Sequence, residues 1–430
     1  MFILRALRSK NYRLFFIGQS LSLIGVWVAR VATSWLVYRM TKSAFLLGTV
    51  GFVGQIPTFL LVSFAGVLAD RVNRQKILFI TQSLFFAQSA VLAFLTLTHR
   101  IAIWHILVLS FVQGAINAFD IPARQSFLIE MIEHKKDLNN AIALNASMFN
   151  LARLIGPAVA GFLIASVGEG LCFLIDSVSY CAVISSLIAM RVPTLKKEIP
   201  KNSMWQDLKQ GIAYALGFVP IRSLLLLVGW SSLVGMSYMV LMPIFAKEVL
   251  HGGPKTLGFL TAASGLGALI GALYLASRKS VIGLERQIVL AAFLAGGGLV
   301  FFSLSDILPT SLLLILLVSF GIMVQLAASN TVLQSIVDDD KRGRVMSLYT
   351  MAVLGMAPFG SLIVGSLAGH VGAGLVVKWG GFAYMTAAIL FAWNLPGIRK
   401  MIHPIYVKKG MVPEIASGIQ TVTELTSPKE

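Results

Sequence analysis

Two long apolar runs near the start of the chain are separated by the segment Gly66-Val67-Leu68-Ala69-Asp70-Arg71-Val72-Asn73-Arg74-Gln75-Lys76. The segment combines one acid with three bases, whereas the runs that it separates, 44–69 and 77–98, are almost entirely apolar. A membrane core about 30 Å thick needs about 20 apolar residues in a helix, and each run is long enough to cross it. A solvated basic loop is the simplest interpretation of the segment, and the flanking runs place that loop at a membrane surface.

The composition of the whole chain supports lipid as part of its solvent. Charged residues make up 12% of the 430 residues and hydrophobic residues 57%, with a mean hydropathy of +0.82. Soluble domains carry about 25% charged residues, so a water-soluble enzyme of this size could not cover its surface. The net charge of +17 does not indicate nucleic acid as a partner, because Lys and Arg stand in short clusters between apolar runs, as in cytoplasmic loops.

Twelve apolar runs are long enough to cross a membrane as helices. They are 12–38, 44–69, 77–98, 101–123, 140–165, 171–190, 222–246, 256–276, 287–304, 311–333, 344–367 and 374–398. With the N-terminus in the cytoplasm, most of the 35 Lys and Arg residues fall on the cytoplasmic side, as the positive-inside rule requires. The sequence therefore predicts an all-α integral membrane protein of twelve transmembrane helices in two six-helix bundles, with both termini cytoplasmic.

The chain is expected to divide into four parts. These are an N-terminal six-helix bundle (1–190), a cytoplasmic connector with an amphipathic helix (191–221), a C-terminal six-helix bundle (222–400) and a mobile cytoplasmic tail (401–430). Within the connector, Ser203-Met204-Trp205-Gln206 fits a capping box, in which the Ser and Gln side chains satisfy free amides at a helix start. Repeated halves with a binding site between them are an architecture of transporters.

The segment quoted first resembles the Gly-x-Leu-Ala-Asp-Arg-x-Gly-Arg-Lys motif of the major facilitator superfamily, and it also follows the second helix, as that motif does. Asn73 stands where Gly is usual, and we expect the turn to survive because Asn tolerates a positive φ better than most residues. Gln75 is a milder departure, since Lys76 follows it. The resemblance implies the major facilitator fold and a transporter.

The resemblance also implies a charge network at a cytoplasmic gate. In such proteins the acid of the motif, here Asp70, sits near the N-terminus of helix eleven, where free amides and the helix dipole favour negative charge. That helix is expected to begin near Arg344. The residues implied for the gate are Gly66, Asp70, Arg71, Arg74 and Arg124. Such a network would hold the gate shut and break on opening, so it says little about the substrate.

A second stretch, Arg153-Leu154-Ile155-Gly156-Pro157-Ala158-Val159-Ala160-Gly161, resembles the Gly-Pro-x-x-x-Gly signature of antiporters in the superfamily. Pro157 removes a backbone donor and bends a helix, and glycines let another helix approach closely. Ordinary close packing would produce the same small residues. The antiporter-like residues that we single out are Arg153, Gly156, Pro157 and Gly161, and the resemblance favours an exporter.

A narrower resemblance covers about the first 190 residues. Its stretches are similar to the enterobactin-exporter branch and its macrolide-efflux relatives, and they are Asp120 to Gln125, Asn139 to Asn145, Arg153 to Gly161 and Cys172 to Asp176. It implies a bacterial-type inner (plasma) membrane. Drug antiporters usually carry an Arg three residues before the Gln-Gly of helix four, whereas Ser110 precedes Gln113-Gly114 here. The proton-linked role of that Arg is therefore not carried over.

Charged residues inside the predicted spans are the candidates for a proton or substrate site, because charge in lipid costs several kcal/mol unless it is paired or hydrated. Arg30 and Asp176 lie roughly 13 and 8 Å from the outer surface at 1.5 Å per residue. They could form a structural ion pair between helices one and six, or Asp176 could carry a proton. Arg153 then has no acid at its depth, and Gln113 and Asn117 could hydrogen-bond it. An unpaired Arg153 would suit an anionic or catecholate-like substrate.

The sequence thus predicts a secondary active transporter that exports an amphipathic small molecule, siderophore-like or drug-like, by proton antiport and alternating access. The alternatives are an uptake symporter, a lipid or lysophospholipid flippase of the same fold, and a non-transporting membrane sensor or assembly subunit. Expected partners are a small molecule, protons and membrane lipid, with no nucleic acid, for a monomer. No enzyme, cofactor or metal is predicted, since no Gly-x-x-x-x-Gly-Lys-Ser/Thr loop is present and the six His residues are dispersed.

Overall fold

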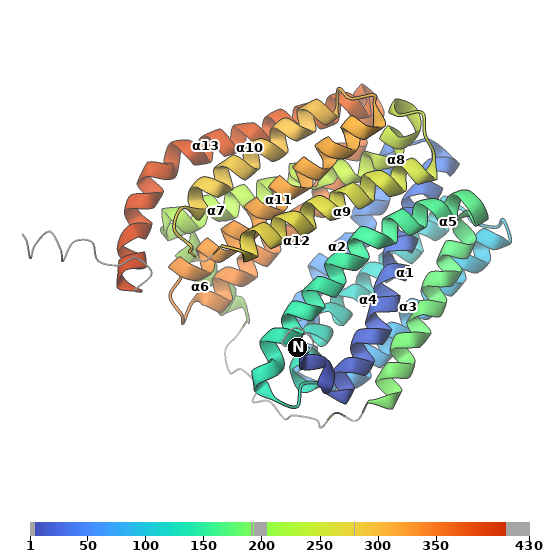
Figure 1. Ribbon diagram of the computed structural model, residues 1–430, viewed down its shortest axis with the longest axis horizontal. Helices are drawn as coiled ribbons and strands as arrows, with labels where there is room; N and C mark the ends of the chain where they lie inside the picture. Colours follow the sequence, from blue (N-terminus) through green and yellow to red (C-terminus); the bar gives the residue numbers. More distant parts are fainter. Residues whose placement is uncertain (1–4, 191, 193–203, 279, 410–430) are drawn as a thin grey trace, which may run out of the picture.

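The computed structural model describes residues 5–190, 192, 204–278 and 280–409. Its helices form two groups that meet at one end and diverge towards the other, where the N-terminus and the ends of α6 and α13 lie (Figure 1). No strand occurs among the described residues. The predicted fold class, an all-α membrane protein built from two bundles, is confirmed.

The described part of the first half contains five long helices and two short 3-10 turns. Their bounds are η1 (Arg5–Arg8), α1 (Lys10–Thr41), α2 (Ala44–Arg71), α3 (Arg74–Leu97), α4 (Ile103–Glu130), η2 (Lys135–Asp137) and α5 (Leu138–Ala189). The motif segment forms the turn between α2 and α3. Asn73 has φ −59° there, so the positive φ that we expected is wrong: its side chain instead accepts a hydrogen bond from the Lys76 amide at 3.1 Å and caps α3.

The second half begins with a connector helix, α6, and continues with a series of long helical spans, one of them irregular. Their bounds are α6 (Met204–Gly217), α7 (Val219–Trp230), η3 (Ser231–Gly235), η4 (Ser237–Leu241), α8 (Met242–Ile244), η5 (Phe245–Val249), α9 (Pro254–Ala276), α10 (Leu284–Phe302), α11 (Leu308–Ile336), α12 (Arg342–Val371) and α13 (Ala373–Lys408). The residues from α7 to η5 form one interrupted span in which η3 and η5 are π-helical and η4 is 3-10.

Eleven helical segments of the described residues are long and apolar enough to cross a membrane. One of them, α5, has 52 residues, which would extend about 78 Å as a straight helix, more than twice a membrane core. Gly168 breaks it with φ +81° and ψ 174°, and Figure 1 shows α5 turning back on itself. We therefore describe two antiparallel limbs, 138–167 and 169–189. Counting each limb as one crossing would reproduce the predicted twelve, which stays a prediction.

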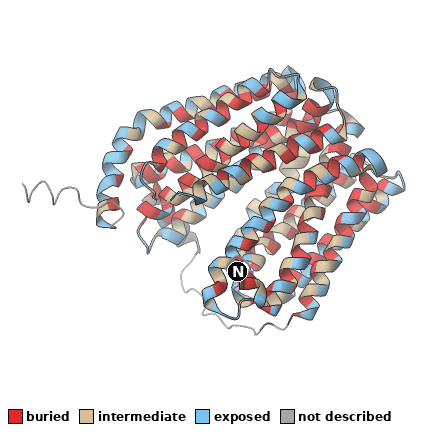
Figure 2. Cartoon of the chain, viewed as in Figure 1, coloured by how far each residue is buried: buried red, intermediate tan, exposed pale blue. Residues whose placement is uncertain are grey.

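Burial follows the two bundles, with buried residues on the faces that helices turn towards one another (Figure 2). Many large apolar side chains point outwards instead, and Trp393 is 77% exposed. Other examples are Leu60, Phe64, Trp104, Ile188, Leu226 and Trp379. Such a surface cannot be kept in water, so the outer faces of both bundles are suited to lipid.

Two seams join the halves at the end away from the N-terminus. In the first, between α5 and α9, a Cβ added at Gly258 would lie 2.6 Å from the Pro157 carbonyl oxygen, and one at Gly161 would lie 2.8 Å from that of Pro254. In the second, between α2 and α12, a Cβ at Gly48 would lie 2.5 Å from the Ser361 carbonyl oxygen. Only glycine allows backbones to approach this closely. The halves are therefore in tight contact at this end.

The connector helix α6 packs against the start of α12, since a Cβ added at Gly211 would lie 3.1 Å from the Arg344 Cβ. Tyr214 Oη also donates to Asp338 Oδ2 at 3.2 Å, and Lys341 Nζ lies 4.5 Å from the Tyr214 ring centroid. The capping box predicted for this helix begins at Ser203, which lies outside the described residues.

The C-terminal helix α13 continues to Lys408, beyond the boundary at residue 400 that the sequence suggested. Tyr406 Oη donates to Glu285 Oε1 at 3.0 Å, and Lys409 Nζ donates to the carbonyl oxygens of Ser335 and Val337, both at 2.9 Å. Because those carbonyls end α11, Lys409 acts as a cationic cap on that helix. Residues 401–409 are thus docked on the second half, and the tail from residue 410 lies outside the described residues.

Candidate functional site

Arg74 of the motif segment and Arg124 of α4 form ion pairs inside the first half. Arg74 is 6% exposed; its Nε donates to the Ala69 carbonyl oxygen at 3.1 Å, and its guanidinium pairs with Glu130 at the end of α4. Arg124 Nη2 lies 3.2 Å from Asp120 Oδ2, and Asp120 Oδ1 also accepts from Thr81 and Gln82. These contacts fasten the turn between α2 and α3 to α4.

The predicted gate is only partly visible in these contacts. The side chain of Asp70 lies outside the described residues, Arg71 is exposed, and Gly66 has open space where a Cβ would stand. Both ion pairs described above stay within the first half. The close contacts between α2 and α12 run from Gly48 and Ser361, at the opposite ends of those helices, to Phe59 and Gly355 near their middles. A latch between the motif and the N-terminus of α12 therefore stays a prediction.

The antiporter-like residues sit where α5 passes between α1 and α9. A Cβ added at Gly156 would lie 2.5 Å from the Cβ of Trp27 on α1. Pro157 and Gly161 face α9 in the seam described above. The motif thus occupies the boundary between the two halves.

The predicted ion pair between Arg30 and Asp176 is wrong. Asp176 is 2% exposed, its Oδ2 accepts from Ser89 Oγ at 2.8 Å, and its Oδ1 has no hydrogen-bond partner among the described residues. Gly25 of α1 packs against Asp176, since a Cβ added at Gly25 would lie 3.1 Å from Oδ1. Residues five apart on a helix, such as Gly25 and Arg30, point about 140° apart, so Arg30 faces another side of α1. Arg30 and Asp176 lie at similar depths in the membrane, but their side chains point in different directions around their helices.

Arg30 turns towards Trp27 and Arg153. Its guanidinium carbon lies 4.7 Å from the centroid of the Trp27 ring, a cation–π contact. Arg30 and Arg153 are close enough to interact electrostatically. Arg153 also interacts electrostatically with Tyr238 of the second half. The Arg30 side chain is exposed, whereas Arg153 is half-buried.

Gln113 and Asn117 do not bind Arg153. Both are half-buried on α4, and neither forms a hydrogen bond to it among the described residues. The helix α4 is instead held by α2: Thr58 Oγ1 donates to the Gly114 carbonyl oxygen at 2.7 Å, and a Cβ at Gly114 would lie 2.4 Å from the Gly54 carbonyl oxygen. The expected hydrogen bonds are therefore wrong, and Arg153 has no ion pair or hydrogen bond among the described residues.

The second half holds a neutral hydrogen-bond network at the corresponding depth. Tyr238 Oη lies 3.0 Å from Ser319 Oγ, which donates to Ser264 Oγ at 2.8 Å. Tyr384 Oη donates to Gln325 Oε1 at 3.0 Å. Tyr238 of this network lies in the irregular span from α7 to η5, which contains Ser and Gly residues and departs from regular α-helix. Such departures are frequent at functional sites.

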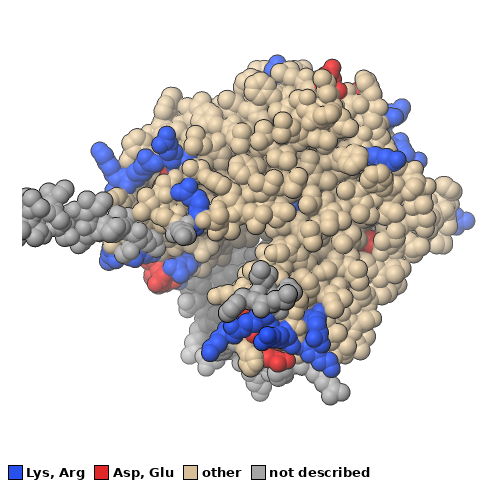
Figure 3. Space-filling view, viewed as in Figure 1, with Lys and Arg blue, Asp and Glu red and all other residues tan. Residues whose placement is uncertain are grey.

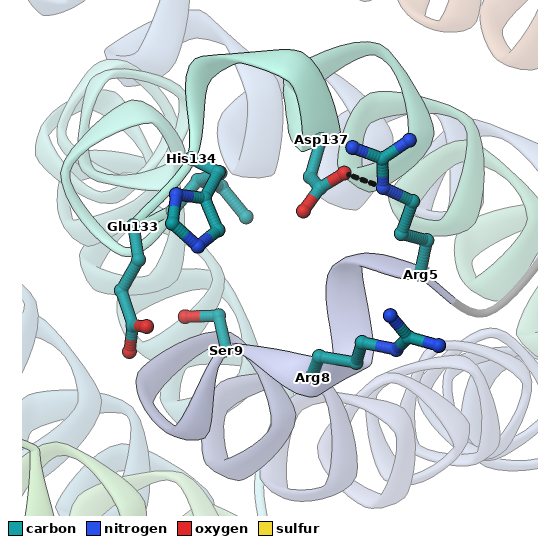
Figure 4. A pocket seen from close by; sticks show the side chains of 7 residues that line it. Arg5, Arg8, Ser9, Glu133, His134 and Asp137 are labelled. Carbon is teal, nitrogen blue, oxygen red and sulfur yellow. Dashed lines mark ion pairs between the residues drawn. The ribbon is translucent and has the colours of Figure 1, made fainter.

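A cavity of about 200 Å³ lies elsewhere, at the end of the first half where the N-terminus lies (Figure 4). It is lined by Arg5, Arg8, Ser9, Ile132, Glu133, His134 and Asp137. Arg5 Nε pairs with Asp137 Oδ1 at 2.5 Å, and Ser9 Oγ donates to the Met131 carbonyl oxygen at 2.7 Å. Opposite charges thus neutralise each other in its wall, and the contacts fasten η1 to the turn before α5.

No group of His, Cys, Asp and Glu that could hold a metal occurs in the described part of the chain.

These features define a class of protein: a polytopic helical membrane protein whose two halves meet at one end, with two arginines near their boundary that have no ion pair among the described residues. The chain belongs to the transmembrane secretion effector family of the major facilitator superfamily, whose sequence profile matches residues 3–404. The predicted resemblance to exporters of this superfamily is confirmed.

Known relatives agree with this assignment. The chain is 28% identical to the staphyloferrin A transporter of Staphylococcus aureus, over 81% of this chain and 87% of that protein. It is 24% identical to macrolide efflux protein A of Streptococcus pyogenes, over 83% and 88%. A solved bacterial homologue of the human lysosomal transporter Spinster, inward-facing and occupied, matches with a TM-score of 0.68 at 13% identity, over 93% of this chain and 98% of that one. That likeness shows the fold alone. The relatives are membrane transporters, and this chain is a multi-pass membrane protein of the same family.

Proposed function

We propose that this protein exports an amphipathic small molecule from the cytoplasm by alternating access, in exchange for protons. The observation that carries the proposal is the arrangement of the two halves: glycine seams close one end, whereas the other end diverges (Figure 1). Between them lie Arg30 and Arg153, charges that need a partner. Rocking about such a seam would expose the same site to each side of the membrane in turn.

The distribution of Lys and Arg supports an orientation in which the open end faces the cytoplasm. Lys and Arg gather at the divergent ends of both halves, and further basic side chains lie at the opposite end (Figure 3). By the positive-inside rule, the divergent end and both termini belong in the cytoplasm of a bacterial-type cell. The opening then admits substrate from inside, as an exporter requires. We also propose that the division at residues 191–221 separates the two moving bundles of a monomer.

Asp176 is the proposed proton carrier. It is buried in a membrane span with one unpartnered oxygen and no cationic partner among the described residues, so its ionised form is costly. Its contacts with Ser89 of α3 and with Gly25 of α1 would change if the first half rearranged. A carboxyl in such a setting can exchange a proton when its surroundings become wet.

The test uses inside-out vesicles that contain the full chain, an acidified lumen and a pH-sensitive dye. Staphyloferrin A and erythromycin are the probes, because relatives handle a siderophore and macrolides. We expect addition of a transported probe to release protons from wild-type vesicles and from the control Asp306→Asn, an exposed acid outside the spans, but not from Asp176→Asn. Probe uptake without proton release would contradict antiport and favour a facilitator or a lipid flippase of the same fold.

A further inference from the structure

Two guanidinium groups without an anionic partner lie together at the boundary of the two halves. Arg30 comes from α1 and Arg153 from the first limb of α5, and they interact electrostatically. Neither forms an ion pair or a hydrogen bond within the described part of the chain. The backbone of Arg153 is fixed against α9, since a Cβ at Gly265 would lie 2.6 Å from its carbonyl oxygen.

The lack of a partner is not a general property of arginine in this half. Arg39 pairs with Glu169 at 2.7 Å, Arg74 with Glu130, and Arg124 with Asp120 at 3.2 Å. Three arginines near the membrane boundaries thus have carboxylates of their own. Among the described residues the two deepest arginines have none and also repel each other, which is unfavourable away from bulk water. An anion that binds between them would relieve this repulsion.

Aromatic side chains fix one wall beside this pair. Trp27 lies under Arg30, and Phe149 contacts Trp27 edge-on with ring centroids 6.3 Å apart. Gly156 lies against the Cβ of Trp27, so α5 holds the indole in place. Tyr238 approaches Arg153 from the second half while its hydroxyl is engaged with Ser319. Trp27 itself is 6% exposed, whereas Phe149 is 46% exposed, so an entering molecule meets two cations next to the Phe149 ring.

We propose that Arg30 and Arg153 together bind a doubly anionic group of the transported molecule, such as two carboxylates on a flat or aromatic frame. The inference rests on the proposed function and names the substrate class of that site. One carboxylate would neutralise one guanidinium and leave the other uncompensated. Two carboxylates can each form the paired N–H···O bonds that guanidinium groups favour, while the frame lies against the exposed Phe149 ring.

The test measures binding of phthalate, benzoate and dimethyl phthalate, which carry two, one and no negative charges on the same ring. The full chain is purified into phosphatidylcholine nanodiscs, so that no anionic lipid competes, and titrated calorimetrically. We expect phthalate to bind about tenfold or more tightly than benzoate, a difference of about 1.4 kcal/mol, and dimethyl phthalate more weakly still. Equal affinity for phthalate and benzoate would overturn the proposal.

Variants assign the preference to the arginine pair. Arg30→Gln and Arg153→Gln should each bring phthalate binding down to the level of benzoate, whereas Arg153→Lys should keep part of the preference. Arg39→Gln is the matched control, because it removes the same charge from the same helix where a carboxylate already compensates it. An equal loss in Arg39→Gln would show a nonspecific charge effect and refute the site.

The outcomes also separate this inference from the proposed function. Wild-type protein that exports a probe in vesicles but shows no preference for phthalate would refute only the dianion site. Wild-type protein that prefers phthalate in nanodiscs but exports nothing would leave the site standing and refute the exporter.

Discussion

The membrane interiors of the two halves differ in their chemistry. The first half places Arg30, Asp120, Arg153 and Asp176 within its spans, and only Asp120 has an ion-pair partner among the described residues. The central parts of the described spans in the second half carry no charged side chain and rely on hydroxyls and one amide. Both halves have similar helices and seams, so architecture alone does not require this difference.

We infer from this difference that contacts with the transported species are concentrated in the first half. Unpaired charge in a membrane is costly, so we propose that the half that holds it handles the charged species. A neutral hydrogen-bond network mainly fixes helices relative to one another. We therefore expect substitutions in the first half to change transport, and comparable substitutions in the second half to change stability.

The largest effect is expected at Arg153. Arg153→Ala should lower the initial rate of export of an acidic substrate by about 10- to 100-fold, because charged hydrogen bonds contribute about 1.5–3 kcal/mol. Uptake into inside-out vesicles, corrected for the amount of inserted protein, measures this. Unchanged export would contradict the role of Arg153 in the first half.

The seam gives the next effect. Gly258→Val introduces a β-branched side chain at a position where a Cβ atom alone would lie 2.6 Å from the Pro157 carbonyl oxygen. Such overpacking costs about 1–3 kcal/mol. Closure of this end should be disfavoured and transport reduced several-fold in the same vesicle assay. Gly297→Ala is the control, because open space surrounds that glycine. A normal rate in Gly258→Val would show that the seam need not close.

A smaller effect is expected in the second half, at the hydrogen bond between Tyr384 and Gln325. Tyr384→Phe leaves Gln325 Oε1 without its donor, which should destabilise the second half by about 1–3 kcal/mol. We expect a melting temperature lower by a few degrees, measured by differential scanning fluorimetry, with export nearly unchanged. Loss of export at unchanged stability would mean that the neutral network also takes part in transport.

The smallest effect is expected at the end of α13. Lys409→Ala removes the cation that binds the Ser335 and Val337 carbonyl oxygens, and helix-end interactions of this kind contribute about 0.3–1 kcal/mol. Limited proteolysis should cut the C-terminal end faster in this variant than in wild type, and export should persist. Identical proteolysis would mean that Tyr406 alone keeps this end docked.

Much of the fold could be predicted from the sequence, because spans are recognised by length and apolarity alone. The site was harder to predict. The depths of Arg30 and Asp176 suggested a pair, but their angular positions depend on how α1 rotates against α3 and α5, which a span count does not contain. Glu130, the partner of Arg74, was missed because it ends α4 and is far away in sequence. Asn73 was recognised as a departure from the motif, yet its capping role depended on where α3 begins.

Gly168 is the whole connection between the two limbs of α5. Next to it, buried Glu169 pairs with Arg39 and pins this corner to α1. Arg153 lies on one limb and Asp176 on the other, and a one-residue corner leaves no slack between them. We therefore expect the hairpin to move as one bent unit, so that a tilt of one limb on binding substrate also displaces the other limb. Mechanical linkage of the two positions needs no contact between their side chains.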